Sequence, residues 1–265
     1  MWHTFFYQPL VNALIFFYGI LGHNLGLAII GLTIAIRAVL TPLTLPSLKS
    51  AQKLRELQPE LEKLKKECGS DRQVFAKKQL EFYRQQGVNP AAGCLPQIAQ
   101  IIVLIALFQA FNQVLRANGD IIANLNQVLY SGLKLAPDTV INPKFLYLNL
   151  TKPDLFTIPA IKISQFTLDK LPGIFLLASA VIQFFSSKLM MPAVKAQEAS
   201  AEKTPEKTDD MATSMQQQML YLMPLMTLFI GFKFPSGLVL YWLTFSLFML
   251  AQQLWTNRKS KTKTP

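Results

Sequence analysis

The sequence predicts an all-α polytopic membrane protein, with five transmembrane helices forming a groove and a cytoplasmic helical hairpin. Composition is the first reason, because 51% of the 265 residues are hydrophobic and only 15% are charged, whereas soluble domains carry about 25% charged residues. The second reason is that the apolar residues gather in long blocks, which is typical of a chain dissolved in lipid. Polar side chains inside these blocks are the third reason, since they predict a hydrated space between the helices.

Five blocks are long and apolar enough to be read as spans, for which a bilayer requires about 20 mostly apolar residues. They cover residues 24–41, 95–115, 172–191, 216–231 and 237–255. The first block ends at Pro42, and the second contains no charge. The last two come from one apolar stretch, which is broken where Lys233, Pro235 and Gly237 predict a tight turn.

Residues 1–22 predict a helix that lies in the membrane interface. The segment is apolar and aromatic, but polar residues and a proline interrupt it, and it lacks the basic start of a secretory signal. Its amphipathic aromatic residues, Trp2, Tyr7 and Tyr18, suit the level of the lipid headgroups. A sixth span is the alternative interpretation.

The lysines and arginines of the connections predict an N-terminus outside and a C-terminus in the cytoplasm. One side of the membrane carries 18 of them, in 42–93, 192–215, the tail 256–265 and Lys188, and the other carries 7. The cytoplasmic side holds such an excess in membrane proteins. The net charge of +11 is therefore explained by topology and by attraction to anionic lipids, and DNA is not expected as a partner.

The connection 42–93 predicts a basic cytoplasmic hairpin whose two helices lie within 49–86. An amphipathic stripe at three- and four-residue spacing is formed by Leu54, Leu57, Leu61 and Leu64. Gly69 marks the end of the first helix and Asp71 the N-cap of the second. The basic residues that could meet a partner are Lys53, Arg55, Lys63, Lys65, Lys66, Arg72, Lys77 and Lys78.

Three further segments outside the membrane carry no recognisable chemistry. The connection 192–215 is rich in Ala, Glu, Lys, Thr and Pro, which predicts a flexible cytoplasmic loop. The tail covers 256–265, and its last part, RKSKTKTP (258–265), is expected to be disordered. The basic residues Arg258, Lys259, Lys261 and Lys263 either anchor the orientation or contact lipid or the ribosome. The extracytoplasmic connection 116–171 predicts short helices near 120–133 and 160–170.

Arg37 is the most costly residue in the predicted spans. A charge at the centre of a membrane helix costs about 2.5–3.5 kcal/mol on insertion scales, so we expect its side chain to face water or partners inside the bundle. Snorkelling to the cytoplasmic end is the alternative, because Pro42 is only five residues further on. Matching polar groups in the spans together predict a hydrated groove: Thr33, Gln97, Gln100, Gln183, Tyr241 and Trp242.

Several chemistries are not expected from this sequence. The predicted spans contain no Asp or Glu, which argues against a proton-coupled transporter. Motifs for ATP binding or for a membrane metalloprotease are missing, and the spans offer no convincing Ser–His or Ser–Lys pair. Two cysteines without a CxxC pair and two histidines predict neither a disulfide scaffold nor a metal site. We therefore expect no enzyme, no catalytic residues and no cofactor.

Over almost its whole length the chain resembles the YidC/Alb/Oxa family of membrane-protein insertases. The motifs that carry the resemblance are GLAIIGLTIAIRAVLTPLTLPSLKS (26–50), GVNPAAGCLPQIAQ (87–100), FLYLNLTKPD (145–154) and FPSGLVLYW (234–242). Each motif is weak alone, but the set is specific. We expect neither the large outer domain of members from many double-membraned bacteria nor the lipobox of single-membraned ones, and 116–144 fits the family pattern poorly.

The resemblance implies a bacterial inner-membrane insertase and chaperone that works without ATP. In this family the groove opens to the cytoplasm and to lipid and is closed on the outer side. It implies that Arg37 attracts an acidic or polar stretch of the client and that Gln183 and Trp242 line the groove. Nascent membrane proteins would be recruited by the hairpin, with the ribosome and the Sec translocon as further candidate partners. A structural assembly factor and a small-solute carrier are the alternatives.

Overall fold

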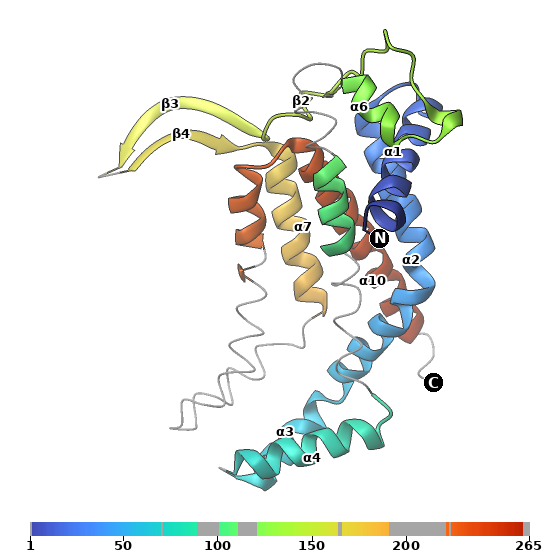
Figure 1. Cartoon of the computed structure of the whole chain (residues 1–265). Helices are drawn as coiled ribbons and strands as arrows, with labels where there is room; N and C mark the ends of the chain where they lie inside the picture. The colour runs from blue at the N-terminus through green and yellow to red at the C-terminus, as the bar shows by residue number, and fades with distance from the viewer. Residues whose placement is uncertain are drawn as a thin grey trace.

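The computed structural model describes residues 2–69, 71–88, 101–110, 121–163, 166–190, 221–222 and 224–261. A bundle of helices forms the centre of the molecule (Figure 1). Its members are α2 (Leu25–Glu56), α7 (Ile174–Met190), α10 (Ser236–Lys261), a helix at Ile101–Ala110 and helical residues 224–231. Within the described ranges two helices are long and apolar enough to cross a membrane, at Leu25–Pro42 and Ser236–Thr256. The helix at Ile101–Ala110 and α7, over Ile174–Leu189, are also apolar but shorter.

α2 does not end at Pro42, as the sequence suggests, but continues through Pro42 and Pro46 to Glu56. Each proline removes one backbone hydrogen bond without necessarily breaking the helix, since neighbouring side chains can satisfy the freed groups. The carbonyls that lose an N–H partner are those of Ala38 and Pro42, four residues before each proline; beside them the Thr41 hydroxyl donates to the Arg37 carbonyl at 2.7 Å and the Thr44 hydroxyl to the Thr41 carbonyl at 3.2 Å. The apolar stretch therefore ends near Pro42, whereas the helix carries on beyond it.

The amino-terminal segment forms a short π-helix (His3–Tyr7) followed by α1 (Gln8–Ile20), which packs on α2. α6 (Ile121–Val128) and a 3-10 turn (Ser131–Leu133) lie against α1. The buried side chain of Asn12 joins the two parts: its amide donates to the Val128 carbonyl at 3.0 Å, and its oxygen accepts from the Tyr130 N–H at 2.7 Å. Part of the connection 116–144 is thus held on α1.

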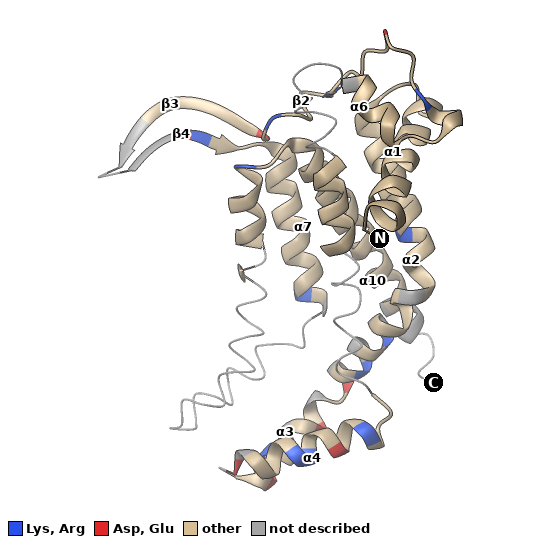
Figure 2. Ribbon diagram, in the orientation of Figure 1, with Lys and Arg blue, Asp and Glu red and all other residues tan. Residues whose placement is uncertain are grey.

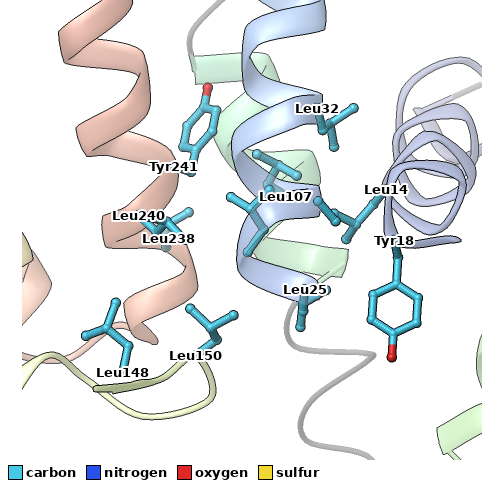
Figure 3. Packing of buried hydrophobic residues seen from close by; sticks show 12 residues of the cluster. Leu14, Tyr18, Leu25, Leu32, Leu107, Leu148, Leu150, Leu238, Leu240 and Tyr241 are labelled. Carbon is cyan, nitrogen blue, oxygen red and sulfur yellow. The ribbon is translucent and has the colours of Figure 1, made fainter. Parts of the chain in front are cut away.

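The main core lies where α1, α2, α10 and the segment 148–150 meet (Figure 3). Its buried members are Leu14, Tyr18, Leu25, Ala28, Ile29, Leu32, Leu107, Leu148, Leu150, Leu238, Leu240 and Tyr241. A glycine at position 26 permits this close packing, because a Cβ there would overlap the ring of Phe145. The buried α2 members of this core all lie between Leu25 and Leu32, so only the first part of the helix contributes to it.

Two β-hairpins show that the description as all-α is too simple and that the helix expected near 160–170 is wrong. β1 (Lys144–Phe145) pairs with β2 (Leu148–Asn149), and β3 (Leu155–Ile163) pairs with β4 (Phe166–Pro172), both antiparallel. β3 is rich in β-branched and aromatic residues, which favour strands. The register shifts between Thr157 and Ile161, so the hairpin contains an irregularity there.

At the opposite end of the bundle, α3 (Gln58–Cys68) and α4 (Arg72–Gln85) pack on each other. The Asp71 side chain caps α4 by accepting from the Val74 N–H at 3.0 Å. Figure 2 shows that basic and acidic residues alternate over these two helices, whereas α7 and α10 are nearly free of charge within the bundle. The disorder expected from residue 258 onward is also wrong in part, because α10 continues to Lys261.

Candidate functional site around Arg37

Three helices of the bundle bury polar side chains along their length. These residues are Thr33, Arg37, Thr44 and Ser47 on α2, Ser179, the half-buried Gln183 and Ser186 on α7, and Ser246, Gln252, Gln253 and Thr256 on α10. Along α2 and α7 the steps are three, four or seven residues, so each set shares one helix face. A polar strip therefore faces the interior on each helix.

The outer faces of the same helices are apolar. Exposed large side chains include Leu27, Ile34 and Val39 on α2, Ile174, Leu177, Val181 and Phe185 on α7, and Leu247, Leu254 and Trp255 on α10. A soluble protein has the reverse arrangement, because its apolar groups leave water for the core. Polar groups inside and apolar groups outside are expected when lipid surrounds the bundle.

Arg37 lies inside this bundle with 4% of its surface exposed. Its guanidinium carbon is 3.7 Å from the centroid of the Phe245 ring on α10, and such a cation–π contact contributes about 2 kcal/mol when it is desolvated. Tyr241 lies one turn before Phe245, with 6.4 Å between the ring centroids. The Arg37 guanidinium of α2 therefore lies against the Phe245 ring of α10, and Tyr241 lies next to that ring.

Thr33, Tyr241 and Trp242 lie at the same helix–helix contact. Thr33 is buried one turn before Arg37, and its hydroxyl donates to the Ile29 carbonyl of its own helix at 2.6 Å. Tyr241 is buried, and Figure 3 shows its hydroxyl pointing in the direction in which α2 continues past Leu32. Trp242 is partly buried against the main core. Four of the residues selected from the sequence thus belong to the α2–α10 pair.

Gln183 lies on α7, which packs on α10 rather than on α2. Its side-chain oxygen accepts a hydrogen bond from the Thr227 hydroxyl, so it joins α7 to the helical residues 224–231. Gln97 and Gln100 lie outside the described residues. The structure therefore places Thr33 and Arg37 of α2 beside Tyr241 and Trp242 of α10. Gln183 is held by a separate contact, between α7 and Thr227.

The position of Arg37 bears on the snorkelling alternative. The apolar span ends five residues beyond Arg37, at Pro42, although α2 itself continues to Glu56. The Arg37 guanidinium packs across the contact onto α10. The arginine is therefore engaged with a neighbouring helix within the bundle.

Sequence reasoning missed several polar and aromatic groups of this region. Phe245 follows Tyr241 by four residues, and this helical spacing could have identified it as a neighbour. Thr227 needed the structure, since it lies 44 residues from its partner Gln183. Three buried atoms have no hydrogen-bond partner in the described part of the chain: Ser186 Oγ, Gln252 Nε2 and Gln253 Oε1.

The basic residues selected for client recruitment lie at the far end of the molecule. Lys53 is on the last turns of α2 and donates to the Gln86 carbonyl at the end of α4. The side chains of Lys63, Lys66, Lys77 and Lys78 are exposed, and Lys65 is half-buried. Arg55 lies in α2 and Arg72 in α4. In the tail Arg258 is exposed, Lys259 and Lys261 belong to α10, and Lys263 lies outside the described residues.

Segment 145–154 caps the first turn of α7 through Asp154. This carboxylate is 2% exposed and accepts from the Leu176 N–H at 2.8 Å and from the Tyr147 hydroxyl at 2.9 Å. Burial raises the pKa of Tyr147 above its usual value, and the neighbouring Asp154 raises it further. The phenol therefore stays protonated at neutral pH and keeps donating to the carboxylate.

The same segment also caps α10. The Ser236 N–H donates to the Lys152 carbonyl at 2.7 Å, the Gly237 N–H to the Leu150 carbonyl at 3.2 Å, and the Ser236 hydroxyl to the Asn149 carbonyl at 2.8 Å. The first N–H groups of a helix have no partner inside the helix, so these carbonyls complete its first turn. One short segment thus fixes the starts of two bundle helices.

Fold and site together define a polytopic helical membrane protein whose charge and polar groups are turned inward. The model of the 60Kd inner membrane protein family matches residues 16–263. A membrane protein insertase YidC of Fusobacterium nucleatum is 34% identical over 89% of this chain and 87% of its own length. The YidC insertase of Oceanobacillus iheyensis is 28% identical, over 99% of this chain and 86% of its own.

The match to the YidC insertase of Syntrophobacter fumaroxidans is 32% identical over 97% of this chain but only 38% of that protein. The chain thus spans most of some relatives and less than half of others. A family match of this extent shows membership. The chain belongs to the 60Kd inner membrane protein family, the YidC insertases.

Proposed function

We infer that this chain is a membrane protein insertase, as its family membership indicates. The observation that carries the inference is a buried arginine on a polar helix face, within a bundle whose outer surface is apolar. Such a bundle gives a polar segment of another chain a place inside the membrane. An insertase makes and breaks no covalent bond, so the protein is not an enzyme.

The physical task is to lower the free energy of a polar segment in hydrocarbon. Transfer of an unpaired polar group from water into an apolar phase costs several kcal/mol. The buried polar residues of α2, α7 and α10 offset part of this cost, and Arg37 supplies a counter-charge to an acidic stretch of the client. The apolar helix of the client then moves sideways into lipid, and its burial drives the reaction.

We propose that the groove is lined by Arg37, Thr33, Gln97, Gln100, Gln183, Tyr241 and Trp242. The contacts of Arg37 with α10 and of Gln183 with Thr227 support a polar interior. Because the guanidinium is stacked on Phe245, an arriving carboxylate would exchange an aromatic partner for an anionic one. The groups without partners, Gln252 Nε2 and Gln253 Oε1, offer further hydrogen bonds near the other end of α10.

Five spans, with the N-terminus outside and the C-terminus in the cytoplasm, agree best with the distribution of charge. The basic hairpin then lies in the cytoplasm and recruits nascent membrane proteins. Segment 145–154 lies at the opposite end of the bundle from this hairpin (Figure 1) and caps both α7 and α10. This arrangement supports a groove that is closed on the outer side.

The amino-terminal helix is proposed to lie in the outer interface rather than to span the membrane. The segment is apolar and aromatic, but Gln8, Pro9 and Asn12 interrupt it, which is unfavourable for a span. The two hydrogen bonds between the Asn12 side chain and the backbone of Val128 and Tyr130 also favour an interfacial position of α1 over one in hydrocarbon. The basic residues that end α10 are proposed to contact anionic lipid or the ribosome.

Proteoliposomes containing only this protein test the insertase function. A single-span client with a short acidic translocated tail is synthesised beside them, and protection of that tail from added protease is measured. Wild type is compared with Arg37→Ala, Arg37→Lys and the control Lys188→Ala, which removes an exposed charge from α7. Loss of protection in Arg37→Ala alone would support a role for the charge, whereas no protection above empty liposomes would contradict autonomous insertion.

The low exposure of Arg37 favours one second candidate, an assembly factor that uses the arginine as a buried contact. The two functions differ in the water accessibility of position 37 without a client. Arg37→Cys, placed in a background lacking Cys68 and Cys94, is treated with a membrane-impermeant maleimide, and Ala28→Cys in the main core is the buried control. Rapid labelling at position 37 supports a hydrated groove, and protection equal to that at position 28 supports the assembly factor.

A further inference from the structure

The hairpin β3–β4 forms an arm that leaves the bundle sideways (Figure 1). Its two strands pair with each other, and no other labelled element in the described part of the chain packs broadly against them. An isolated two-stranded hairpin is marginally stable in water. Toward its tip Ile161 pairs with Leu168 and Ile163 with Phe166, and the polar pair Lys162–Thr167 lies between them, so apolar residues alternate with polar ones. We therefore expect the arm to be stabilised by contact with a surface outside the described part of the chain.

The base of the arm is fixed to the start of α7. Leu155 pairs with Pro172, and Gly173 alone separates β4 from α7. The Gly173 N–H donates to the Asp154 carbonyl at 2.8 Å, and a Cβ at Gly173 would overlap the Asp154 side chain. The arm thus begins at the level where the apolar helix begins, which is a boundary of the membrane.

Exposed apolar side chains continue from the outer face of α7 onto the arm. Along α7 they form a stripe at Ile174, Leu177, Val181 and Phe185. The stripe extends to Leu171 on β4, which is 41% exposed, and to its cross-strand partner Phe156, which is 43% exposed. Directly opposite residues of a strand pair point to the same face, so Phe156 and Leu171 form one exposed apolar patch at the base of the arm, and Leu171 precedes the first stripe residue, Ile174, by three positions.

The surroundings of this patch have the chemistry of a membrane interface. Tyr147 is 46% exposed and stacks on Phe156 with 5.6 Å between ring centroids. The charged side chains of Lys152, Asp169 and Lys170 are exposed near the base of the arm. Amphipathic aromatic rings and lysines with long apolar stems are the residues that occupy the headgroup level.

We propose that the β3–β4 arm lies on the lipid surface, with Phe156 and Leu171 inserted at the boundary between headgroups and acyl chains. With the orientation given above, this is the outer leaflet. We assign lipid as the occupant because the patch lies beside the start of α7, whose exposed side chains are apolar, and because exposed aromatic and lysine side chains surround it. The arm is thus an interfacial anchor that holds the start of α7, through Asp154 and Gly173, at a fixed depth.

Spin labels on single cysteines measure this placement directly. Phe156→Cys and Leu171→Cys are made in a chain with Cys68→Ser and Cys94→Ser, labelled with a nitroxide, and reconstituted in phosphatidylethanolamine–phosphatidylglycerol vesicles. Leu177→Cys on α7 is the lipid-facing control, and Val140→Cys, at a position 85% exposed, is the aqueous control. Collision rates with oxygen and with a polar nickel chelate on both sides of the membrane are compared.

We expect labels at 156 and 171 to resemble the label at 177, with high oxygen collision and nickel collision several-fold below that at 140. Nickel collision equal to that at 140 would overturn the proposal, because the arm would then stand in water. Low collision with both reagents would overturn it as well, since another protein chain would cover the patch. Two labelled positions guard against a local effect of either substitution, and neither outcome depends on insertase activity.

Discussion

Asp154→Ala is expected to loosen the end of the bundle that segment 145–154 caps. The buried carboxylate accepts from the Leu176 N–H at 2.8 Å and from the Tyr147 hydroxyl at 2.9 Å. Each hydrogen bond to a charged group contributes about 1.5–3 kcal/mol. Tyr147 is half-exposed and can turn its hydroxyl to water, whereas the residue Leu176 is fully buried and its N–H loses its acceptor. The free energy of unfolding should therefore fall by about 2–4 kcal/mol.

The assay is unfolding in detergent, followed by the midpoint of a thermal or denaturant transition. Asp154→Asn keeps an oxygen that can accept from Leu176, so we expect it to lose less, about 1–2 kcal/mol. Asp138→Ala is the matched control, because this exposed carboxylate should change stability by no more than about 0.5 kcal/mol. Equal midpoints for Asp154→Ala and Asp138→Ala would refute the capping argument.

Three further substitutions test the contacts that organise the rest of the chain. Asn12→Ala should destabilise the packing of α6 on α1 by about 1–3 kcal/mol, because two backbone groups lose a buried partner; hydrogen exchange would detect the opening. Asp71→Ala should lower the helicity of the α3–α4 hairpin through loss of about 1 kcal/mol of capping, as circular dichroism would show. Gly26→Leu should cost about 1–3 kcal/mol of stability by overlap with Phe145.

Each of these three predictions has an internal control. After Asn12→Ala the Tyr130 amide should exchange faster, while the Leu135 amide, held by Asn126 at 2.8 Å, should not change. Asp71→Asn keeps the cap and should restore helicity. Gly19→Leu should be tolerated because nothing lies within 4 Å of a Cβ there. If a test and its control changed equally, whether in amide exchange, helicity or stability, the contact tested by that pair would be contradicted.

The candidate site shows how far residue patterns lead. The cost of a charge in hydrocarbon singled out Arg37, and helical spacing grouped it with Thr33. No pattern pairs Arg37 with Phe245, or Gln183 with Thr227, because these partners lie on different helices. Such contacts depend on how each helix is rotated about its axis when it packs, and that rotation is decided by many side chains together.

The fold shows the same division at particular residues. Pro42 bounds the first apolar block and lacks a backbone N–H, yet α2 passes through it. The strands of β3 and β4 were mistaken for a helix, since short apolar runs are ambiguous between the two structures. In both places a local preference of modest energy yielded to its surroundings.

The membrane class, the excess of basic residues on one side and the exceptional position of Arg37 follow from the sequence by itself. They depend on composition and on the cost of charge in lipid, which act on each residue separately. Only the tertiary structure decided that Asp154 caps α7, that Asn12 latches α1 to the Val128–Tyr130 turn, and that a β-hairpin extends from the bundle. The Asn12 and Asp154 contacts join residues 116 and 22 positions apart, and their free energy exists only once both partners are brought together. The hairpin pairs neighbouring strands, whose short apolar runs are compatible with a helix as well.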